Sequence, residues 1–238
     1  MNVHIVQDYA TLSRHAAKII ADELRRKPDL VLGLAAGNTP LGTYQELVRM
    51  HREEDLDFSR TTVFNLDEYG GLDRTSAQSF HDFLHLNFVN LIHIPKSNVH
   101  FLSYPSLSVD SYCEQFERKI REAGGIDLQI LGIGQNGHIA FNEPGSSIAS
   151  RTRVVTLEPG NDTRSLNTAI TMGVATILES RRILLLASGR QKAEVIANAL
   201  EGPVTEEIPA SFLQEHRDVV VIADEASAGN LKKLRRAG

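Results

Sequence analysis

The chain has 238 residues, of which 42% are hydrophobic and 23% are charged, and its net charge is −5. This composition is typical of a globular protein, and the dispersed charges form no basic face for nucleic acid or an anionic membrane. No apolar stretch approaches the roughly 20 residues that cross a bilayer, and the N-terminal residues do not resemble a secretory signal. Cys113 is the single cysteine, which excludes an internal disulfide. We therefore expect a cytoplasmic protein with one domain over residues 1–238.

Strand-like and helix-like periodicities alternate along the whole chain. Short β-branched or leucine-rich runs predict strands at residues 30–34, 62–66, 127–133, 153–157, 183–187 and 219–223. Helical apolar spacing predicts helices at residues 9–26, 41–51, 76–91, 108–123, 191–200 and 226–235. This alternation predicts an α/β fold, namely a Rossmann-like three-layer sandwich with a mostly parallel central sheet flanked by helices.

Four loops of unusual composition follow predicted strands directly, at residues 35–40, 67–71, 134–145 and 188–192. Parallel sheets bind ligands at the carboxyl ends of their strands, so we expect these loops to form one pocket. In the first loop, Gly37 and Asn38 precede Thr39, which suits a helix N-cap, and Pro40, which suits the first helical position. The free N–H groups of such a helix start favour phosphate, although an ordinary strand-to-helix turn has the same composition.

The last loop carries Arg190 and Lys192 in the first turn of a predicted helix. A cation opposes the helix dipole at this position unless an anion lies between them. Lys192 is therefore a candidate phosphate ligand. The alternative is a solvated helix start, which accounts for either cation without any ligand.

The second loop begins with two carboxylates, Asp67 and Glu68, after an apolar strand. A carboxylate beside a C–H alpha to a carbonyl can act as a general base, and partial burial would raise its pKa. Because strand alternation points the two side chains in opposite directions, we expect only one of them to face a substrate. The alternative is a pair of acidic residues that opens a surface loop.

The third loop contains glycines at 132, 134 and 137, which satisfy the G-x-G-x-x-G spacing of dinucleotide-binding proteins. That fingerprint opens a helix, whereas Asn142 and Pro144 would break a helix here, so we reject this interpretation. His138, Asn142 and Glu143 favour proton transfer around a small polar ligand instead, because imidazole changes its charge near neutral pH. His81 and His85 have the spacing of a helical metal pair, but no glutamate lies between them and we expect no metal site there.

At these loops the chain resembles the glucosamine-6-phosphate deaminase family, within a wider group that includes 6-phosphogluconolactonases. The resemblance runs through most of the sequence and is most specific in NLDEY at residues 65–69 and GHIAFNEP at residues 137–144. It implies that Asp67 moves a proton between C2 and C1 of the opened sugar, while His138, assisted by Glu143, opens the pyranose ring. It also implies that no redox cofactor or catalytic metal takes part.

The resemblance also implies a small amino sugar phosphate as the binding partner and a protein that is a monomer or a homo-oligomer. The residues that match the family's phosphate-binding loop and lysine are Gly37, Asn38, Thr39 and Lys192. Asn136 stands where some members have an aspartate. Its amide can accept a hydrogen bond from His138, but it cannot stabilise an imidazolium by charge.

Two further departures concern binding and regulation. The segment after Arg164 is shorter than is usual in the family, which predicts weaker substrate binding. Val155 stands where allosteric members have a cation, so we do not expect allosteric activation. Both statements follow from the resemblance alone.

Three other functions stay open at this point. Residues 208–213 resemble the galactosamine-6-phosphate branch, and a 6-phosphogluconolactonase would share the architecture. A lactonase has no need for Asp67 at the position for C2–C1 transfer. A non-catalytic sugar-phosphate sensor would need the anion loop but neither the base nor the ring-opening residues.

Overall fold

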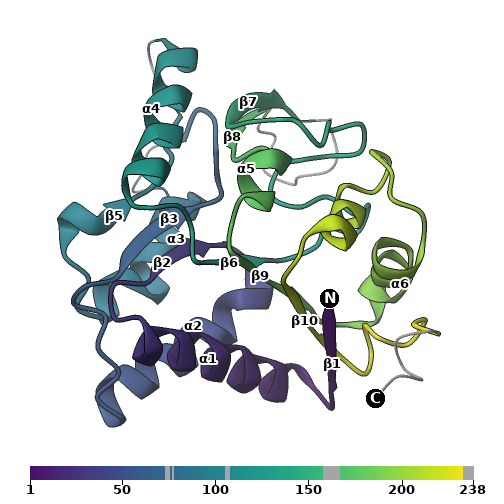
Figure 1. Cartoon of the computed structure of the whole chain (residues 1–238), viewed down its shortest axis with the longest axis horizontal. Helices are drawn as coiled ribbons and strands as arrows, with labels where there is room; N and C mark the ends of the chain where they lie inside the picture. The colour runs from purple at the N-terminus through teal and green to yellow at the C-terminus, as the bar shows by residue number, and fades with distance from the viewer. Residues whose placement is uncertain (73–75, 77, 105–107, 158–166, 233–238) are drawn as a thin grey trace.

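The computed structural model describes residues 1–72, 76, 78–104, 108–157 and 167–232. Within this part of the chain, seven strands form one sheet in the order β1-β10-β9-β6-β2-β3-β5, and every neighbouring pair is parallel (Figure 1). The predicted parallel sheet flanked by helices is therefore confirmed. Its strands are β1 (Asn2–Val6), β2 (Val31–Leu34), β3 (Thr62–Asn65), β5 (Val99–His100), β6 (Leu128–Leu131), β9 (Arg182–Ala187) and β10 (Val219–Asp224).

A second, antiparallel sheet contains β4 (Asp67–Tyr69), β8 (Thr168–Thr171) and β7 (Arg153–Thr156), with β8 in the middle. The predicted strand at 153–157 exists, but it belongs to this sheet and not to the central one. Its residues are partly buried or exposed, whereas β2 and β6 are buried along their whole length. Burial on both faces distinguishes a central parallel strand from a peripheral one.

The helices are α1 (Tyr9–Arg26), α2 (Asn38–Glu53), α3 (Phe80–Asn87), α4 (Val109–Glu122), α5 (Val174–Leu178) and α6 (Ala193–Glu201). Short 3-10 turns are η1 (Val89–Leu91), η2 (Lys96–Asn98), η3 (Arg190–Lys192) and η4 (Pro209–Glu215). Figure 1 shows α1 and α2 together below the central strands and α4, α5 and the small sheet above them. No described helix has the length and apolar character needed to cross a bilayer.

Several predicted boundaries are wrong for local reasons. The helix expected at 76–91 begins at Phe80, because Ser79 accepts a hydrogen bond from the Asp82 N–H and caps α3. In place of the helix expected at 226–235, residues 225–230 form turns, and residues 233–235 lie outside the described part. There the Asp224 carboxylate binds the Ser227 N–H. The pattern also missed β1, β4, β5, β8 and α5, which are all short elements.

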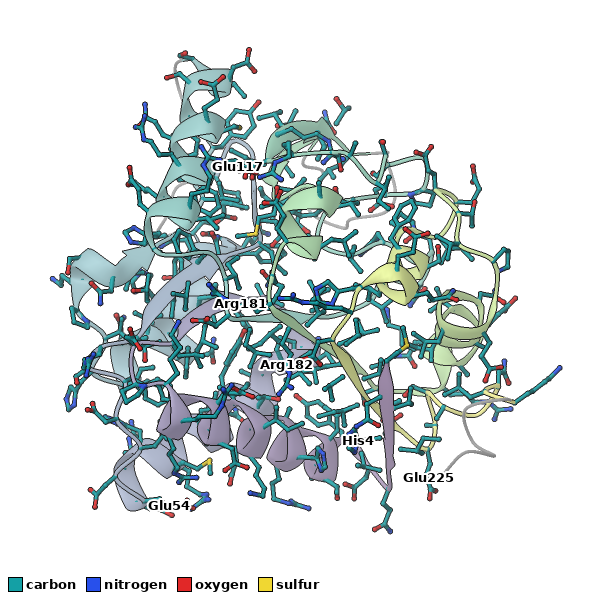
Figure 2. The ribbon with its side chains drawn as sticks, viewed as in Figure 1. His4, Glu54, Glu117, Arg181, Arg182 and Glu225 are labelled. Atoms are coloured by element: carbon teal, nitrogen blue, oxygen red, sulfur yellow. The ribbon has the colours of Figure 1, made fainter. Side chains whose placement is uncertain are left out.

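Glu117 joins α4 to the small sheet and to α5 (Figure 2). Its buried carboxylate accepts hydrogen bonds from the Thr152 N–H and hydroxyl at 3.0 and 2.6 Å, and from the Thr176 hydroxyl at 2.5 Å. Arg151 completes the cluster with an ion pair. Burial opposes ionisation of this carboxyl, but its hydrogen bonds outweigh burial and lower the pKa of Glu117.

Candidate active site

A cavity of about 230 Å³ lies at the carboxyl ends of β2, β3 and β6. Three of the four predicted loops line it, together with residues of the small sheet and α3, whereas the loop at residues 188–192 does not. This volume lies below the roughly 300–1,000 Å³ of pockets that hold drug-sized ligands, so the cavity suits a small molecule. Of the predicted site residues, those that line the cavity are Gly37, Asn38, Thr39, Asp67, His138 and Glu143.

The loop after β2 places a helix N-terminus at this cavity. Gly37 is the N-cap residue of α2 and has φ +110°, a conformation that favours glycine. Asn38 is the first helical residue, so α2 begins three residues before the predicted start at residue 41, and neither Thr39 nor Pro40 has the position expected of it. No side chain caps this helix, and its first N–H groups therefore suit an anionic ligand.

Asp67 is the first residue of β4 and its side chain is 7% exposed at the cavity wall. Asn65 holds the backbone here, because its amide donates to the Asp67 carbonyl at 2.9 Å and its oxygen accepts from the Leu102 N–H at 2.6 Å. Burial, together with the nearby charge of Glu68, raises the pKa of Asp67 to about 8. Such a carboxylate suits the role of general base near neutral pH.

Glu68 points away from Asp67, as strand alternation predicts, and does not line the cavity. It accepts hydrogen bonds from Ser79 and from backbone N–H groups at the start of α3. Of the two carboxylates, only Asp67 faces the cavity. The bare sequence did not indicate what the other one binds.

The loop after β6 brings His138 and Glu143 together, with 3.0 Å between the imidazole Nδ1 and the carboxylate Oε1. The two groups are in contact, but the geometry at Nδ1 does not satisfy that of a hydrogen bond. Burial opposes the charge of Glu143, but its contacts with His138 and Asn136 lower its pKa. The turn itself closes where the Gly134 N–H donates to the His138 carbonyl at 2.9 Å.

Asn136 makes a different contact from the one expected. Its amide nitrogen donates to Glu143 at 2.5 Å, and its oxygen accepts from the backbone N–H of His138 at 3.2 Å, not from the imidazole. Asn136 does not line the cavity. It therefore orients the carboxylate that lies beside the imidazole.

Asn142 connects this loop to the small sheet. The side chain is fully buried, and its amide donates to the carbonyls of Ile139 and Met172 at 2.9 and 2.8 Å. Its oxygen accepts from Arg153 of β7 at 2.8 Å. The position of the loop thus depends on β7 and β8, which also carry β4 and Asp67.

Lys192 is the predicted phosphate ligand that does not line the cavity. It lies in η3 after β9, next to β6 in the sheet, and burial lowers the pKa of its amine. The described residues provide it with no ion pair. In the same loop, the Ser188 hydroxyl and the Gly189 N–H donate to the Asp224 carboxylate, so these two donors are engaged within the protein.

Three aromatic residues, Tyr69, Phe80 and Phe141, line the cavity. The Tyr69 ring lies 4.9 Å from the rings of Phe80 and of Phe141. The motifs contain Tyr69 and Phe141, but no sequence signal identified Phe80. The segment after Arg164 that predicted weaker binding begins with residues 165–166, which lie outside the described residues, and leads into β8 at Thr168.

Comparison with known proteins gives full-length matches. The family model described as glucosamine-6-phosphate isomerases/6-phosphogluconolactonase matches residues 7–222. A glucosamine-6-phosphate deaminase of Clostridium botulinum (strain Langeland / NCTC 10281 / Type F) is 43% identical, over 98% of this chain and 99% of that protein. Glucosamine-6-phosphate deaminase 2 of Bacillus subtilis (strain 168) is also 43% identical, over 98% of each chain.

Solved structures give the same result. A monomeric glucosamine-6-phosphate deaminase of the NagB superfamily superposes with a TM-score of 0.92 at 43% identity, over 97% of this chain and all of that one. A 6-phosphogluconolactonase from Thermotoga maritima has a TM-score of 0.75 at 24% identity, over 94% and 99% of the two chains, which shows a shared fold. The chain belongs to the glucosamine-6-phosphate isomerase/6-phosphogluconolactonase family.

Proposed function

We propose that this chain is a glucosamine-6-phosphate deaminase, which converts glucosamine 6-phosphate and water to fructose 6-phosphate and ammonia. The observation that carries the proposal is that Asp67, with its raised pKa, lines the same cavity as the His138–Glu143 pair. The two full-length relatives at 43% identity that bear this name support it. Galactosamine-6-phosphate deaminase and 6-phosphogluconolactonase activity are the alternatives.

In the proposed reaction, His138 opens the pyranose ring by moving a proton between the C1 hydroxyl and the ring oxygen, and Glu143 supports the charged imidazole. Ring opening comes first because a closed hemiacetal has no carbonyl to acidify the C2 proton. Asp67 then removes this proton from C2 and returns it to C1, while the C1 oxygen gains a proton and the amino nitrogen loses one, which leaves a C1 hydroxyl and an imine at C2. Water adds to the imine carbon, ammonia leaves, and the ketose remains.

The substrate phosphate would bind at the start of α2, to Gly37, Asn38 and Thr39, and the ammonium of Lys192 would contribute charge. Lys192 would reach this group from η3, which follows β9, and β6 lies between β9 and β2 in the sheet. We also propose a cytoplasmic location, since Cys113 is buried and unpaired. The monomeric relative favours a monomer over a homo-oligomer.

The test is release of ammonia and fructose 6-phosphate from glucosamine 6-phosphate, with galactosamine 6-phosphate and 6-phosphogluconolactone in parallel. We expect turnover of the glucosamine compound above the other two. Binding of glucosamine 6-phosphate without any product would favour a sensor. Asp67→Asn should abolish turnover and retain ligand binding, and substantial residual activity would remove Asp67 from the role of base.

A further inference from the structure

Glu68 is a buried carboxylate next to the proposed base, and the proposed reaction assigns it no step. Its side chain is 4% exposed and lies between β4 and the start of α3. Each of its two oxygens accepts two hydrogen bonds. The donors are the backbone N–H groups of Tyr69, Phe80 and His81, at 2.8, 3.1 and 2.8 Å, and the hydroxyl of Ser79, at 2.7 Å.

The partners of Glu68 are mostly hydrogen-bond donors. Oε1 faces two N–H groups, and Oε2 faces one N–H group and a hydroxyl, so three of the four partners can only donate a hydrogen bond. The carboxylate also lies at the N-terminus of the eight-residue helix α3, where the helix dipole favours an anion. The geometry around Glu68 therefore suits the negatively charged carboxylate.

Asp67 has the opposite environment. Its carboxylate lines the cavity, is almost fully buried, and accepts no hydrogen bond from any described residue. A negative charge already held on the next residue opposes ionisation of a second buried carboxylate. Asp67 is therefore the member of the pair that gains and loses a proton, which is what a base that carries hydrogen from C2 to C1 must do.

We propose that Glu68 is a positioning residue whose negative charge adds to the effect of burial and raises the basicity of Asp67. The inference rests on the proposed function and deepens it, because it assigns the strength of the base to a residue outside the cavity. Glu68 does not touch the substrate. The charge of Glu68 stabilises the protonated form of Asp67, and the Asp67 carboxylate is correspondingly a stronger base toward the substrate proton.

The experiment compares the pH dependence of kcat/KM for the wild type, Glu68→Gln and Ser79→Ala. The glutamine keeps the shape of the side chain and removes its charge, so the acidic limb should move to lower pH by about one unit. Ser79→Ala is the matched control, because it removes a donor to Glu68 and the cap of α3 but keeps the charge. The acidic limb of the Ser79→Ala profile should stay at the wild-type pH, even if this variant is less stable to heat.

A second test does not depend on turnover. It follows the carbon NMR signal of the Asp67 carboxyl as the pH changes. Relative to the wild-type protein, Glu68→Gln should move the Asp67 transition to lower pH. An unmoved Asp67 transition in folded Glu68→Gln would overturn the inference. A shifted transition in a protein that releases no ammonia would refute the proposed function alone.

Discussion

The hydrogen-bonded carboxylate of Glu117 supplies a test of how α4 and α5 hold the small sheet that carries Asp67. Glu117→Gln keeps one oxygen for the donors of Thr152 and Thr176 but removes the charge that pairs with Arg151. A hydrogen bond to a charged group contributes about 1.5–3 kcal/mol. Since the Arg151 side chain is 38% exposed and can regain water, we expect a loss near the middle of this range, about 2 kcal/mol.

For a chain of this length, that loss corresponds to a decrease in Tm of about 4–8 °C. The assay is thermal and urea unfolding followed by circular dichroism. Glu122→Gln is the matched control on the same helix, because Glu122 forms an exposed pair with Arg118 at 3.7 Å. An exposed pair of this kind contributes about 0–1 kcal/mol, so the control should unfold close to the wild type.

The pH dependence of this effect has a defined sign. Because the pKa of Glu117 is lowered in the folded protein, its contribution is present above the ordinary carboxyl pKa and is lost as the pH falls through the lowered value. The difference in the free energy of unfolding between wild type and Glu117→Gln should therefore shrink in acid. Equal stability of the two proteins at neutral pH would refute the role given to this cluster.

The other predictions concern the cavity. Asp67 must be ionised to accept a proton and its pKa is raised to about 8. We therefore expect kcat/KM to rise about tenfold from pH 7 to pH 9, and a flat profile would contradict this. Lys192→Gln should raise KM at least about tenfold through loss of a charge-assisted contact, with little change in Tm, and an unchanged KM would remove Lys192 from the phosphate site. In Gly134→Ala the added Cβ would lie 2.3 Å from the His138 ring, so kcat should fall about 100-fold, and a wild-type kcat would show that the ring position does not matter.

The parallel sheet and the position of the cavity could be predicted from periodicity and strand ends. Three of the loops, at residues 35–40, 67–71 and 134–145, follow β2, β3 and β6. These strands are parallel neighbours in the sheet, so their carboxyl ends place the three loops together. The contact between His138 and Glu143 is local and lies within one loop. Such features depend on short-range geometry, which a single sequence expresses directly.

The partners of polar side chains were harder to predict. Asn136 was expected to accept a hydrogen bond from the imidazole of His138, but it donates to Glu143 and binds the backbone. Lys192 was expected at the phosphate site, yet it does not line the cavity. A side chain of either type has several acceptors or donors within reach, and only the surrounding backbone selects among them.

The sequence by itself determined the class of fold, the edge of the sheet that holds the cavity, and the residue types for proton transfer, because periodicity and loop composition are local properties. Only the tertiary structure paired β4 with β8, which places Asp67 opposite Thr171 and Glu68 against the start of α3. That pairing joins segments far apart in the chain. It therefore depends on contacts between distant residues, which no local sequence pattern indicates.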